Sequence, residues 1–599
     1  MNPEQRAAAE TTRGPLCILA GAGTGKTTTI TRRIAWQVAT RAFPPQQIVA
    51  VTFTDKAAGE LRSRLGALGV EGVRASTFHS AALALLRRFH GDPGRILASK
   101  AILLRRIGNG LPGAYRFRPA GDLATEIEWA KNRRLTPETY LDGLGDHEPP
   151  IPPDLAHRVF REYERRKAAE DLLDFEDLLE RTVRLLEEDE QARAAVHERW
   201  RAFTVDEYQD VNVLQQSLLD LWLGERDELC AVGDDYQAIY GFTGASARWL
   251  LALPQRFPHA HVVKLERSYR STPQVLELAN RLVPRLGGSA KTLAPTLEAG
   301  PEPVAGPGLE VVAHVRQLHE GGVPLEEMAV LVRTNARTTE FEEAFHDAGI
   351  PFQGASLLAR DAARQLLKAL RSLRGPAAEI VRELAVRQGL LAEVPDKLGE
   401  REQTRQADLA RLVRLADEFG GDVDGFVESL HERFGESAGR GVHLLTLHRA
   451  KGLEWEAVFL PHLEEGELPI RRGDVDEERR LFYVGLTRAK RHLLVTWEGR
   501  PSRFLDELGV RAAAPPLPKR EKPVLEQTPT VRALREWRLA RARADEVPAY
   551  VVFNDRTLAE LATRTPRTLA ELSAVPGIGP TKLERYGPEL LARLAELAA

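Results

Sequence analysis

Short apolar runs alternate with helix-compatible stretches along the first part of the chain. The runs LCILA (16–20), IVAVTFT (48–54) and VRASTF (73–78) are each followed by a stretch that favours a helix. Continuous apolar runs that recur between helices are typical of parallel strands buried on both faces. The pattern therefore predicts a helix-covered parallel sheet, built from residues 1–95 and from 190–265, where strand-like runs return.

A second strand-rich region follows, and a helical segment interrupts each of the two. Residues 96–189 are mostly helical and highly charged. Further apolar runs, AVLVRT, VHLLTLH, AVFLPHL and HLLVTW, predict a second α/β domain from 266–350 and 441–506, with a helical, strand-poor insertion at 351–440. The expected fold class is α/β, with two sheet-bearing domains that each carry a helical insertion.

The C-terminal part of the chain differs from the rest. Residues 507–528 are rich in proline and charge and lack an apolar period, which predicts a linker. Residues 529–599 contain short helical segments such as RALREWRLARARA. We expect a small all-α domain there.

Composition narrows the function classes. At 599 residues the chain is too long for one hydrophobic core, and about four domains of roughly 100 to 200 residues are expected. It has neither a basic-then-apolar N-terminus nor a run of about 18 apolar residues, so we expect a cytoplasmic protein without a membrane span. Cys17 and Cys230 lie in apolar runs, which favours buried, reduced thiols and excludes a cysteine-rich zinc site. The net charge of −3 implies that any grip on nucleic acid is local.

The stretch ILAGAGTGKTTTI (18–30) has the chemistry of a phosphate-binding loop. Its small residues let successive backbone N–H groups close around phosphate oxygens at a helix N-terminus. Lys26 adds a point charge and Thr27 a hydroxyl ligand for Mg²⁺, whereas Ala20 departs from the glycine of the formal pattern. The predicted loop comprises Ala20, Gly21, Ala22, Gly23, Thr24, Gly25, Lys26, Thr27 and Thr28.

Two further strand ends carry chemistry that suits a nucleotide. Asp206 and Glu207 end the run FTVDEY, where one carboxylate can bind Mg²⁺ and the other can orient or deprotonate an attacking water. Adjacent acids are common at protein surfaces, but their pairing with a phosphate loop strengthens the assignment. Gln237, after the run ELCAVGDD, could sense a γ-phosphate with its amide.

Nine ordered motifs carry a family resemblance. They are GAGTGKTT, VTFTDKAA (51–58), STFHS (76–80), VDEYQD, VGDDYQAIY, LERSYRST (265–272), VRTNA (332–336), LTLHRAKGLEW (445–455) and RRLFYVGLTRAKR (479–491). In this order and context the chain resembles superfamily 1 DNA helicases of the UvrD/Rep/PcrA type, over about 500 residues. The resemblance implies two RecA-like motor domains with ATP between them and single-stranded DNA across their tops.

The resemblance also implies roles around the nucleotide. Gln5 would read the adenine edge, Tyr269 would stack on the ring and Glu454 would bind the ribose. Arg270 and Arg488 would reach the γ-phosphate from the second motor domain. Arginines of this kind are worth roughly 10³ to 10⁵ in rate, and they would couple hydrolysis to domain closure. The expected catalytic residues are Lys26, Glu207, Gln237, Arg270 and Arg488, and Thr27 and Asp206 are the expected Mg²⁺ ligands.

The resemblance implies that a set of aromatic and polar side chains binds the single-stranded DNA. For each aromatic residue of this set, ordinary packing in the core is the competing interpretation. The expected DNA-binding residues are Phe53, His79, Tyr240, Phe242, Arg333, Asn335 and His448. Stacking on aromatic rings tolerates any base sequence, as a moving motor requires. The pair Phe242-Thr243 departs from the Trp-Arg usual in the family, and Asp55 and Arg449 are further departures.

Two larger differences concern the helical parts. The second insertion, near 90 residues, is much shorter than the family's, which is often close to 200 residues. The tail, with TLAELSAVPGIGPTKLERYG, resembles the HRDC domain of RecQ-type helicases and RNase D. The segment Gly577-Ile578-Gly579 could present backbone N–H groups to a DNA phosphate, or could simply form a tight interhelical turn. Together these features suggest the HRDC-bearing subgroup of UvrD-like helicases.

These observations predict a DNA helicase and single-strand translocase that uses ATP and Mg²⁺, with 3′ to 5′ polarity implied by the family. We expect it to act in DNA repair or replication on single-stranded and on forked or tailed duplex DNA, as a monomer. One alternative is a translocase that strips proteins from single strands and unwinds poorly, which the shortened insertion leaves open. A small-molecule kinase is a second alternative. A kinase would have a pocket for its substrate and would not be stimulated by DNA. Arg270 and Arg488, expected from the second motor domain, count against this alternative.

Overall fold

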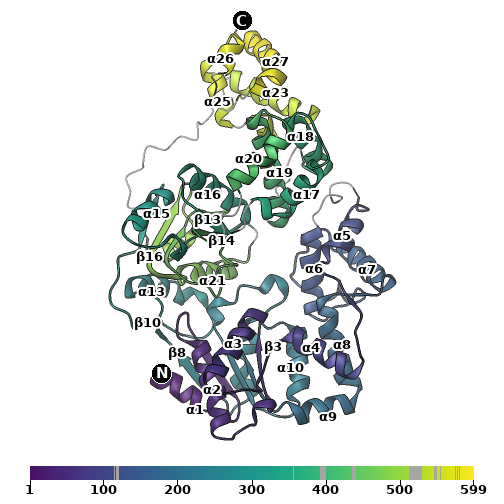
Figure 1. The fold of residues 1–599 in the computed structure, drawn as a ribbon, viewed down its shortest axis with the longest axis vertical. Helices are drawn as coiled ribbons and strands as arrows, with labels where there is room; N and C mark the ends of the chain where they lie inside the picture. The colour runs from purple at the N-terminus through teal and green to yellow at the C-terminus, as the bar shows by residue number, and fades with distance from the viewer. Residues whose placement is uncertain are drawn as a thin grey trace. The chain divides into compact units, whose positions relative to one another are not determined.

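The computed structural model describes residues 1–112, 115, 120–354, 357–391, 400–434, 440–471, 473–510, 529–545, 549–553, 555–573, 575, 578 and 580–598. The chain divides into two compact units (Figure 1). Unit 1 comprises residues 1–311, 327–333 and 447–511, and unit 2 comprises 312–326, 334–446 and the described residues of the tail. Among the described residues, none of the helices has the length and apolar character needed to cross a membrane.

Six parallel strands form the first sheet of unit 1, in the order β3-β2-β6-β7-β1-β8. Their bounds are β1 (Leu16–Ala20), β2 (Ile48–Thr52), β3 (Arg74–Thr77), β6 (Ala202–Val205), β7 (Leu229–Gly233) and β8 (His261–Leu265). The helices that precede or connect them are α1 (Pro3–Glu10), α2 (Lys26–Ala39), α3 (Asp55–Ala67), α4 (Phe78–Phe89), α10 (Val213–Leu223), α11 (Arg248–Leu251) and α12 (Leu253–Arg256). The apolar runs read from the sequence are therefore the strands of this sheet.

Both faces of this sheet are buried. Along β1, Cys17 and Leu19 belong to one apolar cluster, whereas Leu16 and Ile18 belong to another. Successive side chains of a strand point to opposite faces, so a strand covered on both sides must be apolar at every position. All five residues of β1, β2 and β7 are buried. Polar chemistry is thereby confined to the loops at the strand ends.

The helical insertion of unit 1 has its own core and a buried network of charges. It contains α5 (Ala101–Gly108), α6 (Ala120–Asn132), α7 (Pro153–Ala169), α8 (Phe175–Glu188) and α9 (Glu190–Arg199), and the short strands β4 (Arg95–Ile96) and β5 (Leu172–Leu173). Lys131 of α6 lies 2.7 Å from Asp174 and 2.5 Å from Asp177, and Lys167 lies 2.6 Å from Asp177. Glu164, Asp174 and Asp177 are spaced as metal ligands could be, but each of them already forms ion pairs with these two ammonium groups.

A second group of parallel strands in unit 1 runs in the order β11-β16-β15-β12. Their bounds are β11 (Val304–Pro307), β12 (Met328–Val332), β15 (Trp455–Leu460) and β16 (Ala489–Trp497). The associated elements are β9 (Arg267–Ser268), β10 (Ala294–Pro295), α13 (Pro273–Asn280), α14 (Val283–Leu286), α21 (Val475–Leu486) and α22 (Arg503–Glu507). The sequence predicts β12, β15 and β16, whereas β11, with its glycine and proline, is too weakly patterned to be predicted.

Unit 2 holds the remaining strands and the shortened insertion. Strand β13 (Phe352–Gly354) pairs in parallel with β14 (Val442–Thr446), and the helices α15 (Val311–Glu320) and α16 (Asn335–Asp347) precede them. The insertion consists of α17 (Asp361–Leu370), α18 (Ala377–Arg387), α19 (Glu400–Phe419) and α20 (Val423–Phe434). The domain boundaries drawn from the sequence stay predictions, because the division into compact units does not follow them.

The C-terminal tail is a helical bundle that shares its core with this insertion. It contains α23 (Pro529–Ala544), α24 (Ala549–Val552), α25 (Asp555–Arg564), α26 (Leu569–Ser573) and α27 (Pro580–Ala598). A single apolar cluster includes Leu412 of α19, Phe553 after α24 and Leu590 of α27, all fully buried. The sequence suggests a separate domain on a tether, but the structure places the bundle against the insertion. Residues 511–528 of the predicted linker, and Gly577 and Gly579, lie outside the described residues.

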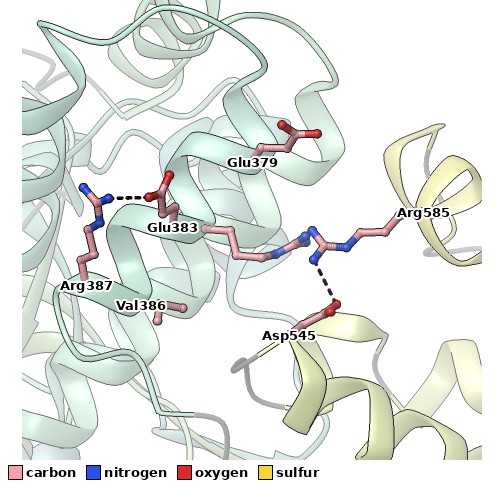
Figure 2. Close-up of a pocket in the computed structure, with 7 residues that line it drawn as sticks. Glu379, Glu383, Val386, Arg387, Asp545 and Arg585 are labelled. Atoms are coloured by element: carbon pink, nitrogen blue, oxygen red, sulfur yellow. Dashed lines mark hydrogen bonds and ion pairs between the residues drawn. The ribbon is translucent and has the colours of Figure 1, made fainter.

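Charged side chains complete the seam between the tail and the insertion. Arg382 of α18 donates to Asp417 of α19 at 2.9 Å, and burial lowers the pKa of Lys582 of α27 although Asp417 opposes this shift. A cavity of about 670 Å³ opens here, lined by Glu379, Arg382, Glu383, Val386, Arg387, Asp545 and Arg585. Figure 2 shows Arg585 directed at Asp545, 3.3 Å away. Three basic residues match three acidic ones in the lining, so the cavity is a charge-balanced part of the seam.

We predict that α19 depends on the tail for its protection from exchange. Ending the chain at Leu517 would uncover the apolar surface that the bundle buries, and exposed apolar surface costs about 25 cal/mol per Å². Amide hydrogen exchange should then become faster in α19, while α2 of unit 1 serves as the internal control. Equal exchange rates of α19 in the full-length and shortened proteins would contradict the shared core.

Candidate functional site

Two glycines shape the phosphate loop between β1 and α2. Gly23 and Gly25 adopt the left-handed backbone region, with φ of 72° and 78°, and Gly25 is the N-cap of α2. A Cβ at Gly23 would lie 2.6 Å from Cβ of Arg270, and one at Gly25 would lie 2.7 Å from Nε2 of Gln5. Both positions therefore require glycine. The loop leads into a helix N-terminus, whose unpaired backbone N–H groups favour an anion.

The charges of the site are paired with one another. Nζ of Lys26 lies 3.2 Å from Oε1 of Glu207. Burial alone would lower the pKa of Lys26, but Glu207 and Asp234 outweigh it and raise this pKa. Burial opposes the charge of Glu207 as well, yet Lys26 and Lys451 lower the pKa of that carboxyl. Burial and the charge of Glu207 raise the pKa of Asp206. Lys26 and Glu207 therefore remain ionised and hold each other in place.

Glu207 is held in an uncommon conformation. Its φ of 50° and ψ of 40° lie in the left-handed region, which costs a residue other than glycine on the order of 1–3 kcal/mol. Gln209 Nε2 donates to Glu207 Oε2, and Oε1 of the same glutamine accepts the N–H of Asp234 at 2.9 Å. The predicted water-orienting carboxylate is thus positioned by a lysine on one side and by an amide on the other.

Two arginines from the later part of unit 1 reach this site. Arg488 is buried and donates to Oε1 of Gln237 at 3.2 Å and to the carbonyl of Leu453 at 3.0 Å. Arg270 donates from Nε to Oε2 of Glu454 at 2.5 Å. Burial, followed by the charge of Arg270, lowers the pKa of Arg488 to about 9. This buried guanidinium would gain from an anion placed beside it.

The other predicted nucleotide contacts surround the loop. Gln5 is buried and donates to the carbonyl of Thr24 at 2.9 Å, and a capping box with Asn2 fixes the start of α1. Tyr269 donates its backbone N–H to the carbonyl of Gly23 at 2.9 Å, while its ring is 47% exposed and free to stack. Adenine contacts at Gln5 and Tyr269 and a ribose contact at Glu454 stay predictions.

The predicted phosphate loop, together with Thr27 and Asp206, fits a nucleoside triphosphate and Mg²⁺. Gly25 is the N-cap of α2 and no side chain caps this helix, so the backbone N–H groups of its first turn can receive phosphate oxygens. Thr27 is the second residue of α2 and Asp206 directly follows β6, so a hydroxyl and a carboxylate lie at the carboxyl edge of one sheet. Hydroxyl, carboxylate and phosphate oxygens are ligands that Mg²⁺ prefers. The ion would supply neutralising charge at the phosphates.

Three of the predicted track residues form an aromatic cluster. The ring centres of Tyr240 and Phe242 are 6.2 Å apart, and that of His448 lies 6.5 Å from Tyr240 and 5.8 Å from Phe242. Phe242 is 45% exposed. Burial, then Arg333 and Lys451, lowers the pKa of His448 to about 3, so the imidazole is neutral. The cluster offers an uncharged, partly exposed stacking surface.

The remaining aromatic track residues follow neighbouring strands. Phe53 comes directly after β2, and His79 lies in the first turn of α4, directly after β3. His79 makes an edge contact with Phe175, at 5.9 Å between ring centres, and Phe175 is 47% exposed. Sequence reasoning missed Phe175. The available signal was an aromatic ring in the first turn of a helix, within the charged stretch LLDFEDLL.

Arg333 and Asn335 differ from the other predicted contacts. Arg333 is buried and forms an ion pair with Glu478, with 2.9 Å between Nη2 and Oε1. Asn335 begins α16 in unit 2, whereas Arg333 belongs to unit 1. Their contact with DNA stays a prediction, and for Arg333 it requires the pair with Glu478 to open.

The structure also shows how the unusual pair Phe242-Thr243 is held. The carbonyl of Thr243 accepts a hydrogen bond from Asn132 of α6 at 2.8 Å. Gly244 follows with φ of 90° and packs against Trp129 and Asn132. The helical insertion of unit 1 thus supports the track loop through its backbone, a contact that does not depend on the side chain at position 243.

Comparison with known protein families agrees with this geometry. The family model described as the UvrD/REP helicase N-terminal domain matches residues 1–258, and the UvrD-like helicase C-terminal domain matches 400–500. The HRDC domain model matches 527–594. "ATP-dependent DNA helicase UvrD2" of Mycobacterium tuberculosis is 39% identical, and the match covers 99% of this chain and 97% of that protein. The chain belongs to the UvrD family of ATP-dependent DNA helicases.

Other UvrD-family relatives are more distant. "ATP-dependent DNA helicase PcrA" of Bacillus subtilis is 28% identical, covering 83% of this chain and 82% of that protein. "DNA helicase II" of Escherichia coli is 29% identical, covering 85% and 87%. A solved structure titled "D. radiodurans RecQ HRDC domain 3" is 42% identical over 12% of this chain and 91% of its own length, at a TM-score of 0.11. The expectation of a UvrD-like helicase with an HRDC domain is confirmed.

This UvrD-family site contains one further residue that sequence reasoning did not single out. Lys451 lies in the turn that also carries His448 and Glu454, and its Nζ lies 2.5 Å from Oδ2 of Asp210. The signal was present in the motif LTLHRAKGLEW. From sequence alone, a lysine in a turn is expected to face solvent. The structure shows that Lys451 is buried and paired with Asp210.

We predict that Glu207→Gln blocks ATP turnover by this UvrD-family protein while preserving ATP binding, because the amide keeps the shape but loses the charge that orients or deprotonates water. Lys26→Ala should weaken nucleotide binding as well. Turnover and nucleotide affinity would be measured for both, with Glu198→Gln on the exposed face of α9 as the control. Near-normal turnover by Glu207→Gln would refute this catalytic assignment.

Proposed function

We propose that this protein is a DNA helicase and single-stranded DNA translocase that moves 3′ to 5′ at the expense of ATP. The observation that carries the proposal is the meeting of Arg270 and Arg488 with the phosphate loop and Gln237 in unit 1. A phosphate loop alone suits many enzymes. Arginines that come from a separate sheet suit an enzyme whose hydrolysis is tied to movement of one sheet relative to another.

The residues of the chain divide the chemistry among them. Lys26 and the two arginines would neutralise charge that develops on the transferred phosphoryl group. Glu207, fixed by Lys26 and Gln209, would orient the attacking water or accept its proton. When phosphates replace Glu207 as the partner of Lys26, the carboxylate becomes available to the water. The ion pair thus holds Lys26 and Glu207 next to each other at the predicted phosphate loop.

The grip on DNA would come from the aromatic cluster of Tyr240, Phe242 and His448, extended by Phe53 and His79. Base stacking on aromatic rings is worth about 1–3 kcal/mol per base and does not depend on sequence. We add Phe175 to this track, since its exposed ring contacts His79. A net charge of −3 agrees with a grip that relies on stacking more than on a broad basic surface.

The names of the relatives support DNA as the substrate. The form of the DNA, the metal, the oligomeric state and the pathway are proposals. We propose single-stranded and forked or tailed duplex DNA as substrates, Mg²⁺ as the metal, and a monomer acting in DNA repair or replication. One observation keeps a second function in view: the insertion of unit 2 has only the four helices α17–α20 among its described residues. A translocase that strips proteins from single strands needs less duplex-holding surface than a helicase.

The test of the proposed function is a direct comparison of two activities. ATP turnover would be measured with and without single strands, alongside unwinding of duplexes that carry a 3′ or a 5′ tail. We expect turnover to rise with single strands and unwinding to occur from the 3′ tail. Stimulation without unwinding would favour the stripping translocase, efficient unwinding from only the 5′ tail would overturn the polarity, and no stimulation would refute the motor.

We predict that Tyr240→Ala lowers single-strand affinity at every salt concentration and leaves the salt dependence nearly unchanged, because it removes stacking rather than a phosphate contact. The reference slope is about −0.7 in log affinity against log salt for each phosphate contacted. Binding titrations over a series of salt concentrations would measure both quantities. Phe419→Ala, an aromatic residue 39% exposed in unit 2, is the control. A mainly altered slope would indicate an electrostatic role near position 240 instead.

A further inference from the structure

One turn of unit 1, residues 447–454, contacts both the nucleotide site and the aromatic cluster. At its start His448 packs against Tyr240 and Phe242. At its end the carbonyl of Leu453 accepts from Arg488, and Glu454 accepts from Arg270. The two predicted functions, phosphate neutralisation and base stacking, are therefore joined by eight residues of backbone.

Lys451 anchors the middle of this turn to the first sheet. Its Nζ lies 2.5 Å from Oδ2 of Asp210 and donates to the carbonyl of Gln237 at 2.7 Å. The same ammonium lies 4.9 Å from the centre of the Tyr240 ring, within the range of a cation–π contact. The ammonium group of Lys451 thus contacts the loop after β6, the loop after β7 and the aromatic cluster.

Each partner of Lys451 is directly linked to a predicted catalytic group. Asp210 ends the short 3₁₀ turn Tyr208–Asp210, and its N–H donates to the carbonyl of Glu207 at 2.9 Å. Gln237 receives Arg488 on its side chain and Lys451 on its carbonyl. A displacement of Lys451 must therefore act on the water-orienting carboxylate and on the amide that contacts the arginine.

The burial of this ion pair makes it sensitive to change. The side chains of Lys451 and Asp210 are 8% and 3% exposed, and Oδ1 of Asp210 is buried without a hydrogen-bond partner. Burial raises the pKa of Asp210 to about 6, although Lys451 opposes this. A buried carboxylate that depends on one cation is costly to leave alone, so the turn has a strongly preferred position.

We propose that Lys451 is a positioning residue that couples nucleotide occupancy to DNA binding. It holds the turn 447–454 in register with Asp210 and the Gln237 carbonyl, so that Arg488 and the aromatic cluster change position together. This inference rests on the proposed motor function and adds the residue through which the two sites communicate. By thermodynamic linkage, whatever factor a nucleotide exerts on DNA affinity, DNA must exert on nucleotide affinity.

The test uses a charge-balanced pair of substitutions in the full chain. Lys451→Gln alone leaves Asp210 unpaired and destabilises the protein, whereas Lys451→Gln with Asp210→Asn removes both charges and keeps hydrogen-bonding groups. For each protein, affinity for an oligothymidine would be measured with and without a non-hydrolysable ATP analogue, together with melting temperature and basal turnover.

We expect the double variant to melt near the wild-type temperature, and its own basal turnover serves as the baseline for measuring stimulation by DNA. Its ratio of DNA affinities with and without the analogue should fall toward one, and the stimulation of turnover by DNA should fall at least tenfold. A merely structural ion pair would instead be fully rescued by charge balance. Lys451→Arg, which keeps the charge, should retain part of the coupling. The control is Arg382→Gln with Asp417→Asn, a buried pair of the same kind in unit 2.

The outcomes separate this inference from the function on which it rests. A double variant with wild-type coupling overturns the role of Lys451 and leaves the motor intact. A wild-type protein without DNA stimulation overturns both. Where the double variant does not fold, hydrogen exchange of the wild type decides. The analogue should slow exchange together in residues 447–454 and in the loop 237–243, and protection of only one of these segments would refute the coupling.

Discussion

Burial of the first sheet on both faces is the constraint from which the rest of unit 1 follows. Strands β1, β2 and β7 are buried at every position because helices cover both sides, and Thr52 at the end of β2 is the one polar residue among them. Polar groups can then lie only at the strand ends, and parallel strands bring their carboxyl ends to one edge. Lys26, Glu207 and Gln237 follow three such ends and meet there. The candidate site is a geometric consequence of the sheet.

Three of the cations at this edge are each paired with a carboxylate. Lys26 is paired with Glu207, Arg270 with Glu454 and Lys451 with Asp210. Arg488 donates to backbone carbonyls, to the amide of Gln237 and to the hydroxyl of Thr487, and burial lowers its pKa. Burying an unpaired ion costs several kcal/mol, so these pairs offset part of the cost of burying the charges of the site. Phosphates would exchange one set of partners for another at little net electrostatic cost.

Unit 2 follows a different principle. Its four-helix insertion is small, and small helical groups bury too little apolar surface to be stable alone. The C-terminal bundle shares a continuous core with it, in which Leu412 and Leu590 are both fully buried. The shortened insertion and the added tail are therefore parts of one packed body, and a change in one alters the stability of the other.

The sequence by itself determined the fold class and the strands with continuous apolar runs, because strand burial leaves a local pattern, and it predicted the phosphate loop from the chemistry of one short segment. Nine short motifs were enough to indicate the UvrD family, and the family comparisons agree. Weak strands such as β11 were not predictable, since four residues that include glycine and proline carry little local preference.

Tertiary structure alone decided which charges meet. Lys451 and Asp210 form an ion pair although they are 241 positions apart in the sequence. Arg333 forms an ion pair with Glu478, and the C-terminal tail packs against the insertion of unit 2. Such pairings depend on how sheets and helices pack. They are long-range, and a lysine or aspartate has the same local signature whether it ends in water or in a buried ion pair.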